Sequence, residues 1–275
     1  MLLTSERPNF TSPSKHCFQL VYQPRVNVLS GAIAGVHAVV SALRDDGAMI
    51  DVEQKHILSI NQLLQLWRWK LSHIAASAGR LRDVSVSLSL SPKLLHDDQW
   101  AFDVLQMLGE QSLPGTCIEV HLMEHGDPLN TQYIEWSFEQ LQRAGVKVAI
   151  DNFPFSPANM AKMARYNFDR IKLSPSLLPD ERDDAAAYNK KCALLRGLID
   201  TVHDLGADAI LTGVNSPFQA DCAGALPAVE MQGSHWETLT TLESIPSSPK
   251  PTVMPTPTKK VKTCVEDKPH LAQSY

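Results

Sequence analysis

The stretch VAIDNFPFSPANMAKMARYNFDRIKLS, residues 148–174, decides the fold class of this chain. Its first apolar run ends at an acid, Asp151, and its last run ends at Lys172 and Ser174. Between the two runs, residues 158–166 have the composition of a short helix. A strand, a helix and a second strand in so short a segment predict a βαβ unit with parallel strands.

The same alternation continues on both sides of this unit. Pro24 is expected to end the first strand, because proline cannot donate to a strand ladder. Units of roughly 25–35 residues predict a parallel α/β architecture, and about eight of them suit a (β/α)8 barrel. The expected strands are 18–23, 33–40, 84–90, 117–122, 146–151, 168–173, 207–213 and 228–233. The expected helices are 53–76, 100–108, 133–143, 158–166, 185–205 and 219–223.

An open, doubly wound sheet is the alternative to a barrel. Such a sheet usually carries a glycine-rich phosphate loop after its first strand. The chain has neither a GxGxxG nor a GxxxxGK[ST] motif. The barrel is therefore favoured.

Composition excludes several classes of protein. The chain has 275 residues, of which 44% are hydrophobic, so it can bury a substantial core. Lysine and arginine number 25 against 30 acids, a net charge of -5. This balance argues against direct nucleic-acid binding and against electrostatic anchoring to a membrane.

Cysteine usage and the N-terminus indicate a cytoplasmic protein. The five cysteines form no CxxC motif and fit neither a disulfide framework nor a zinc ribbon. No run of 18 apolar residues is present, so no membrane span is expected. The first ten residues lack the long apolar core of a signal peptide.

The last 35 residues differ in composition from the rest. They hold six of the 18 prolines, no glycine, and five lysines against three acids. Such a segment is typical of a flexible, solvated tail, and a proline-rich or basic docking element is the alternative. We therefore expect an N-terminal extension at 1–15, a folded domain at 16–240 and a flexible tail at 241–275.

The order of several short motifs resembles the EAL domain, the cyclic-di-GMP phosphodiesterase family of bacteria. The resemblance runs from about Phe18 to Leu239. Any one motif is weakly specific, but six in the family's order point to the family's fold. The motifs are Tyr22-Gln23-Pro24, VSVSLS at 84–89, IEVHLME at 118–124, the stretch 148–174, LTGVNSPFQ at 211–219 and Gln232-Gly233-Ser234.

The resemblance implies a (β/α)8 barrel with one antiparallel strand and a site at the C-terminal ends of the strands. It also implies hydrolysis of a phosphodiester by two divalent cations that several acids hold. Five family site positions are retained in this sequence: Gln23, Glu124, Asp151, Lys172 and Gln232. Eight are substituted: His37, Ser41, Ser87, His121, Asn152, Ser174, Thr212 and Asn215.

These substitutions remove most of the expected metal ligands. His37 and His121 stand where the family has metal-binding glutamates, and Ser87 stands where it has a metal-binding asparagine. Magnesium and calcium need several oxygen ligands, and a close cation pair needs anionic ones. We therefore expect an inactive branch of the family, with no catalytic residue, no bound metal and no cofactor. The Pro154-Phe155-Ser156-Pro157 segment also replaces a glycine-bearing loop, which should alter its backbone.

Three alternatives remain open within this expectation. His37, His121 and Asp151 could together bind zinc or iron(II), or the two histidines could reflect drift after metal binding was lost. Lys172 could pair with Asp151 or contact a ligand, and Gln23 and Gln232 could satisfy backbone groups at strand ends.

The function implied by an inactive EAL domain is regulation by binding. We expect the partner to be another protein, such as a transcriptional or signalling regulator, in the control of motility, biofilm formation or virulence. A non-catalytic cyclic-di-GMP receptor is the first alternative, which Ser41 weakens because a phosphate-binding arginine is lost there. A phosphodiesterase with an altered metal site is the second.

Overall fold

The described part of the chain covers the expected folded domain. In the computed structural model it comprises residues 18–43, 49–51, 58–79, 81, 84–96, 99–123, 131–153, 157–228, 230–236 and 241. The expected N-terminal extension, the expected tail beyond Thr241 and the proline-bearing segment 154–156 lie outside these residues.

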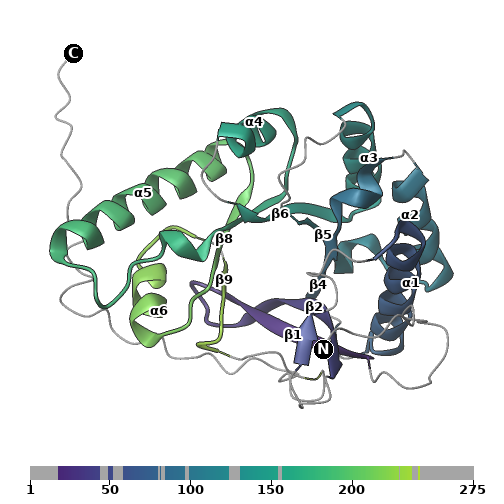
Figure 1. Cartoon of the computed structure of the whole chain (residues 1–275), viewed down its shortest axis with the longest axis horizontal. Helices are drawn as coiled ribbons and strands as arrows, with labels where there is room; N and C mark the ends of the chain where they lie inside the picture. Colours follow the sequence, from purple (N-terminus) through teal and green to yellow (C-terminus); the bar gives the residue numbers. More distant parts are fainter. Residues whose placement is uncertain are drawn as a thin grey trace.

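Eight described strands close into a barrel (Figure 1). Strand β1 pairs with β9 on one side and with β2 on the other, and it is antiparallel to both. The remaining barrel strands are mutually parallel, so the expected barrel with one antiparallel strand is confirmed. The barrel strands are β1 (Phe18–Asn27), β2 (Ile33–Leu43), β4 (Ser85–Leu90), β5 (Ile118–Leu122), β6 (Lys147–Phe153), β7 (Arg170–Leu173), β8 (Asp208–Thr212) and β9 (Glu230–Gln232).

The prediction that Pro24 ends the first strand was wrong. β1 continues to Asn27, and Pro24 lies opposite Val36 in the ladder with β2. Pairing with β9 begins only at Arg25, so Pro24 has a strand partner on one side alone. A proline is tolerated at such a position because its missing N–H is not needed there.

Six helices follow the strands. The predicted start of the first helix at residue 53 was not found: residues 52–57 lie outside the described part, and α1 begins at Ile60. A capping box sets this start, in which the Ser59 hydroxyl accepts from the Gln62 N–H and the Gln62 side chain accepts from the Ser59 N–H. The helices are α1 (Ile60–Ala76), α2 (Gln99–Glu110), α3 (Thr131–Arg143), α4 (Pro157–Arg165), α5 (Ala185–Asp204) and α6 (Pro217–Gly224).

Four short elements were not predicted. Strand β3 extends the edge beside β2, and three 3-10 helices lie in the connections that the structure describes. They are too short to show a periodic pattern. Their bounds are β3 (Met49–Asp51), η2 (Pro92–His96), η3 (Gly115–Cys117) and η4 (Pro175–Leu177).

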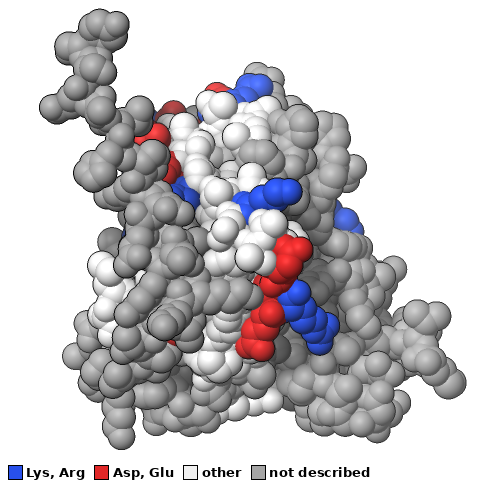
Figure 2. Space-filling view, turned by 90° about the vertical axis from the view of Figure 1, so that its left-hand side faces the viewer, with Lys and Arg blue, Asp and Glu red and all other residues white. Residues whose placement is uncertain are grey.

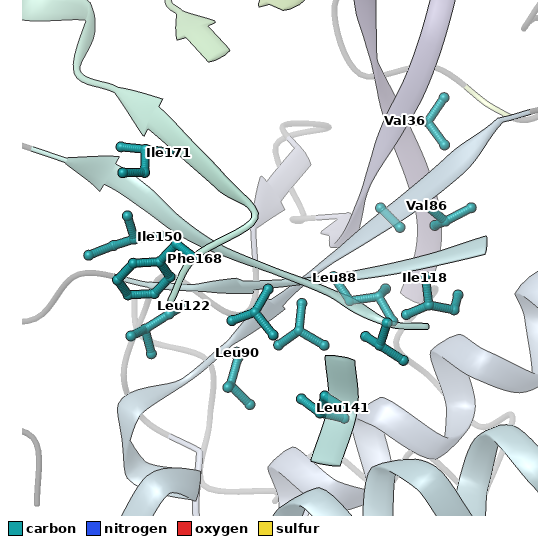
Figure 3. Packing of buried hydrophobic residues seen from close by; sticks show 14 of the residues in the cluster. Val36, Val86, Leu88, Leu90, Ile118, Leu122, Leu141, Ile150, Phe168 and Ile171 are labelled. Atoms are coloured by element: carbon teal, nitrogen blue, oxygen red, sulfur yellow. The ribbon is translucent and has the colours of Figure 1, made fainter. Parts of the chain in front are cut away.

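The core lies between the outer face of the barrel and the helices that cover it. Figure 3 shows Leu141 of α3, Leu88 of β4 and Ile118 of β5 in one cluster, all fully buried. Trp67 of α1 and Trp100 of α2 are among the largest buried side chains, and both pack in the same cluster. Apolar side chains between the barrel and the helices thus supply the hydrophobic core, and polar side chains can lie inside the barrel.

None of the described helices is long and apolar enough to cross a membrane.

Candidate functional site

A cavity of about 440 Å³ opens at the C-terminal ends of the parallel strands. We call it the mouth. This is the end of a barrel at which enzymes of this architecture bind their ligands. The mouth is lined by Gln23, His37, Val39, Ser89, Met123, Asp151, Lys172, Pro175, Thr212, Gly213, Asn215, Gln232 and Gly233.

Most of the residues predicted for the site meet in the mouth or just below it. Of the retained set, Gln23, Asp151, Lys172 and Gln232 line the cavity, and Glu124 lies outside the described residues. Of the substituted set, His37, Thr212 and Asn215 line it, and Ser87 and His121 are fully buried beside His37. Three positions contribute less: Ser41 is buried in β2, Ser174 caps η4, and Asn152 lies in β6, where its side chain is not described.

An ion pair crosses the mouth. The Lys172 Nζ atom lies 3.0 Å from Oδ1 of Asp151. Burial alone would raise the pKa of Asp151, but the Lys172 ammonium outweighs it and holds that pKa well below the usual range. Of the two interpretations of Lys172, the structure shows the pairing with Asp151.

Two amides also pair across the mouth. The Gln232 Nε2 group donates to Oε1 of Gln23 over 2.6 Å. This bond joins β9 to β1, whose direct backbone pairing begins at Arg25. The other amide oxygen, Oε1 of Gln232, is buried and accepts no hydrogen bond from a described residue. The two glutamines therefore bond each other rather than only backbone groups.

His37 is held between two serine hydroxyls. Its Nδ1 atom lies 3.0 Å from Oγ of Ser87, and its Nε2 atom lies 3.2 Å from Oγ of Ser89. The Ser87 hydroxyl donates to the carbonyl of Val36, so it accepts from Nδ1–H. The Nε2 lone pair then accepts from Ser89. Burial, reinforced by the charge of Lys172, keeps the pKa of His37 well below its usual value, which favours this neutral form.

His121 lies below His37, with 5.6 Å between the two ring centroids. Its Nε2 atom is 3.0 Å from Oε2 of Glu119. Burial lowers the pKa of His121 to about 4, although the hydrogen bond to Glu119 acts in the opposite direction. His121 is therefore neutral at pH 7 and donates to Glu119.

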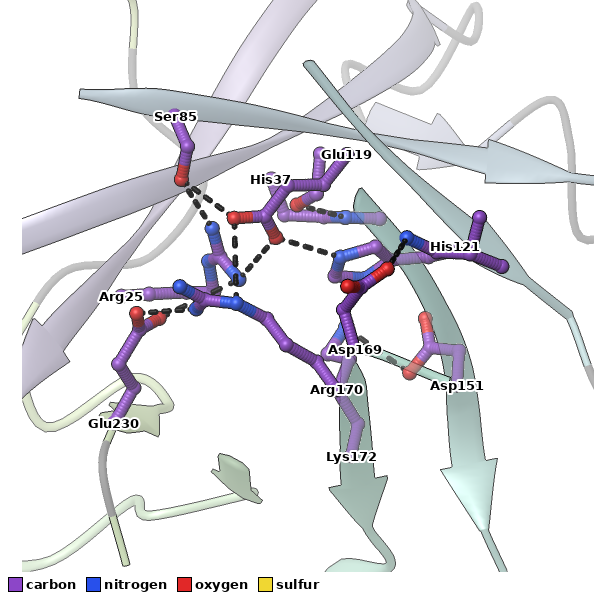
Figure 4. Close-up of polar contacts among 12 residues, drawn as sticks. Arg25, His37, Ser85, Glu119, His121, Asp151, Asp169, Arg170, Lys172 and Glu230 are labelled. Carbon is purple, nitrogen blue, oxygen red and sulfur yellow. Dashed lines mark hydrogen bonds and ion pairs between the residues drawn. The ribbon is translucent and has the colours of Figure 1, made fainter. Parts of the chain in front are cut away.

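A buried layer of charges forms the floor of the mouth (Figure 4). We call it the ionic floor: Arg25, Glu119, Arg170 and Glu230. Nη1 of Arg25 lies 2.7 Å from Oε2 of Glu119 and 3.4 Å from Oε2 of Glu230. Arg170 pairs with Glu230 through Nη1 and lies 3.5 Å from Glu119 through Nε. Two cations and two anions balance, so the layer has no net charge.

The sequence patterns did not predict the ionic floor. Each of its members lies two positions from a predicted site residue on the same strand: Arg25 from Gln23, Glu119 from His121, Arg170 from Lys172 and Glu230 from Gln232. In a strand, residues two apart share one face. This alternation was the signal that could have revealed the layer.

Gly35 makes room for the ionic floor. A Cβ atom at this position of β2 would lie 2.1 Å from Nη2 of Arg25. The guanidinium therefore occupies the volume that any other side chain would need. Ser85 completes its contacts, accepting from Arg25 at 2.8 Å and donating to Glu119 at 2.7 Å.

The residues of the mouth do not fit a pair of divalent cations. Its one described carboxylate, Asp151, is already paired with a lysine. Hard cations need several oxygen ligands and anionic charge, whereas the other polar groups here are neutral amides, hydroxyls and imidazole. A transition-metal site fits no better, since Nε2 of His37 faces Ser89 and Nε2 of His121 faces Glu119. Within the described ranges, no three His, Cys, Asp or Glu side chains are grouped to hold a metal ion.

Surface charge is mixed in sign on the face shown in Figure 2, where Lys and Arg lie beside Asp and Glu. Several exposed ion pairs are of this kind, such as Arg165 with Glu135 at 3.0 Å. The described residues on that face thus form no extended basic patch. The expectation of no direct nucleic-acid contact stays a prediction.

Comparison with known proteins finds the EAL domain model matching residues 11–238. An uncharacterised protein of Synechocystis is 24% identical over 226 residues, which cover 80% of this chain and 32% of that protein. A probable cyclic di-GMP phosphodiesterase of Escherichia coli, PdeI, is 23% identical over 223 residues, 78% of this chain and 28% of that protein. This chain thus spans about a third of the length of these two relatives.

A solved structure shares the fold. The standalone versatile EAL protein of Vibrio cholerae O395, in its c-di-GMP-bound form, superposes with a TM-score of 0.68 at 18% identity. The match covers 84% of this chain and 95% of that one. At this identity the likeness establishes the barrel and leaves the chemistry of the mouth to be argued from its own residues.

Proposed function

Because this chain belongs to the EAL domain family, whose members include cyclic-di-GMP signalling proteins, we propose that it is a non-catalytic regulator that acts by binding another protein. The observation that carries the proposal is the ion pair of Lys172 and Asp151 in the mouth. It neutralises the one described carboxylate there without a metal. The regulated process that we propose is motility, biofilm formation or virulence.

The polar groups of the mouth support this proposal as a set. Asp151 bonds Lys172, Gln23 bonds Gln232, and His37 bonds two serines. Buried polar groups are costly unless they are hydrogen-bonded. A mouth in which most of these polar groups bond one another is stable without cations. Such a chain can keep the barrel as a scaffold for binding after hydrolysis is lost.

Hydrolysis provides the direct test of the non-catalytic half. The purified chain, incubated for hours with cyclic-di-GMP and either magnesium or manganese, is expected to yield no linear dinucleotide by chromatography. Without two cations, the mouth has no metal to activate water, and its described cation, Lys172, is already paired with Asp151. An active EAL phosphodiesterase run in parallel is the control. Linear product that grows with enzyme concentration would contradict the proposal.

Binding to another protein is the second part of the proposal, and it has its own test. The tagged full chain is expected to retain a protein from its native cells, and that protein, once purified, should bind the purified chain at a fixed stoichiometry. The same experiment with the chain ended after Thr241 tells whether residues 242–275 take part. A chain that binds no purified candidate in either form would remove the basis for a protein-binding role.

A cyclic-di-GMP receptor is the second candidate. The cavity of about 440 Å³ favours it, since Gln23, Lys172 and Gln232 line it and Oε1 of Gln232 accepts no hydrogen bond from a described residue. The structure of the Vibrio cholerae relative contains cyclic-di-GMP. Calorimetry separates the two candidates: heat of binding at micromolar ligand supports the receptor, and no heat at several hundred micromolar supports the protein binder.

A further inference from the structure

Two thiols and a phenol meet where α5 packs against α6, outside the barrel. Tyr188 and Cys192 lie one turn apart on α5, and Cys222 lies on α6. The Sγ atom of Cys222 donates to Oη of Tyr188 over 3.7 Å. Cys192 also hydrogen-bonds Tyr188, so both sulfur atoms contact one oxygen atom. We call these three residues the thiol cluster.

The thiol cluster is separate from the main core and lies close to the surface. Its members are 2–4% exposed and pack with one another rather than with the large cluster around the barrel. Among the described residues, the apolar side chains that pack against it are Phe218 and Ala225, and both are half-buried. A local opening of this thin cover is enough to admit a molecule as small as hydrogen peroxide.

The Tyr188 hydroxyl provides a hydrogen-bond donor for a thiolate. Burial raises the pKa of Tyr188, and the contacts with Cys222 and Cys192 act in the same direction, so the hydroxyl stays protonated at neutral pH. Oη accepts from Cys222, which leaves the hydrogen of the hydroxyl for Cys192. A donor beside a thiol favours its charged form, and the charged form is the one that reacts with peroxides.

The second thiol distinguishes this cluster from an ordinary buried cysteine. A single buried cysteine is usually inert. Here two sulfur atoms lie within two hydrogen-bond lengths of each other, so the second can trap the first oxidation product as a disulfide. Cys117, the other cysteine in the described part of the chain, lies in η3 outside this cluster and provides an internal comparison.

We propose that the thiol cluster is a site of reversible oxidation by peroxides, at which Cys192 and Cys222 form a disulfide that joins α5 to α6. The Cys192 thiolate attacks one peroxide oxygen, the O–O bond breaks, and the departing hydroxide takes up a proton to become water. The Cys222 sulfur then loses its proton and attacks the sulfenic acid at Cys192, and the S–O bond breaks to release a second water. Two thiols and one hydrogen peroxide thus give one disulfide and two waters, and a dithiol reverses the reaction.

The disulfide would fix one wall of the mouth. Helix α6 directly follows the segment that contributes Thr212, Gly213 and Asn215 to the mouth. The N–H of Asn215 donates to Oε1 of Gln219 on α6 over 2.8 Å, which couples this segment to the helix. The proposal does not depend on whether the mouth hydrolyses cyclic-di-GMP or the chain binds another protein.

Peptide mapping of the full chain tests the proposal. The protein is treated with hydrogen peroxide, its remaining thiols are blocked with iodoacetamide, and it is digested without reductant. The expected product is a cross-link between Cys192 and Cys222, with the loss of two hydrogen atoms, which dithiothreitol removes. Cys117 is expected to remain a blocked thiol. Recovery of Cys192 and Cys222 as blocked thiols, as sulfinic or sulfonic acids, or joined to other cysteines overturns the proposal.

Matched variants show whether the fold brings the two thiols together. In Cys222→Ser, oxidation of Cys192 is expected to stop at the sulfenic acid, which dimedone labels, whereas Cys117→Ser should form the cross-link as the wild type does. In urea, cross-links should spread over the five cysteines of the unfolded chain. A Cys192–Cys222 cross-link that is no more abundant in the folded protein than in urea contradicts the proposal.

Tyr188→Phe keeps the ring and removes the hydroxyl. The rate of thiol loss with peroxide at pH 7 is expected to fall at least about threefold, and its pH midpoint to rise, because the Cys192 thiolate loses its donor. Circular dichroism confirms that the variant is folded. A rate and a pH profile identical to those of the wild type would overturn the part assigned to Tyr188, since a purely structural side chain would leave both unchanged.

Discussion

Replacing Glu119 by alanine is expected to lower the free energy of unfolding by about 3–5 kcal/mol, the cost of breaking a buried ion pair by removing one partner. Glu119 accepts from Arg25, Ser85 and His121 and is 1% exposed. Burial alone would raise its pKa, but Arg25 and His121 reverse the shift and keep it ionised. Without it, the two buried arginines share one buried carboxylate, Glu230, and the partly exposed Asp208 lies 4.0 Å from Arg170. Urea denaturation measures the loss.

Glu139→Ala is the matched control for this prediction. Glu139 also pairs with an arginine, Arg143, at 3.2 Å, but both side chains are more than half exposed. Exposed pairs of this i,i+4 kind are worth about 0.3–0.5 kcal/mol. If Glu119→Ala cost no more than Glu139→Ala, the ionic floor would not hold the barrel together.

Replacing Lys172 by methionine is the second large effect. It is expected to cost about 2–3 kcal/mol at pH 7, less than a fully buried pair, because the Asp151 side chain is 22% exposed at the mouth. The variant leaves a carboxylate in the mouth without its cation, among neutral polar groups that do not offset its charge. Burial then becomes the dominant influence and raises the pKa of Asp151 above its usual value.

The pH dependence of this cost has a definite sign. In the wild type, the pKa of Asp151 is depressed, so its contribution to stability is present above about pH 4 and is lost as the pH falls below that value. In Lys172→Met the pKa is raised, so the folded state gains relative stability as the pH falls through the raised value. The difference in stability between the two proteins should therefore shrink from pH 7 toward pH 4.

A second variant separates the charge from the packing. In Lys172→Met/Asp151→Asn the uncompensated carboxylate is gone, and most of the lost stability should return at pH 7. Arg165→Met, which removes the partner of the half-exposed Glu135 on the surface, should show little pH-dependent change above pH 5. A Lys172→Met cost that does not vary between pH 4 and 7, or that the double variant fails to relieve, would show that Asp151 is not held ionised by Lys172.

Much of the fold followed from local patterns. The strands at 84–90, 117–122 and 168–173 were found within a residue or two, because alternation or an unbroken apolar run marks each of them. Element ends were less certain. A proline such as Pro24 ends a strand only where the strand has a hydrogen-bonded neighbour on both of its edges. Whether β1 has a second neighbour at Pro24 depends on β9, more than 200 residues away in the sequence.

Only some contacts of the mouth could be predicted, because the others depend on which strands lie side by side. The pairing of Lys172 with Asp151 was one of two open interpretations, since both lie at the ends of adjacent strands. The bonds of His37 to Ser87 and Ser89, and of His121 to Glu119, were not anticipated. They depend on the register between β2, β4 and β5, and a one-residue slip would move every side chain to the other face.

By itself, the sequence determined that this chain forms a barrel of mainly parallel strands, and it predicted the positions at which we expect the mouth to lack the family's acids. Periodicity and residue type are local properties of the sequence, so the elements that they predict do not depend on distant contacts. Only the tertiary structure decided that the remaining charges form two layers: Lys172 with Asp151 in the mouth, and Arg25, Glu119, Arg170 and Glu230 beneath it. Closing the barrel brings together side chains from five strands, β1, β5, β6, β7 and β9, and their Coulomb energy depends on distances that no local pattern contains.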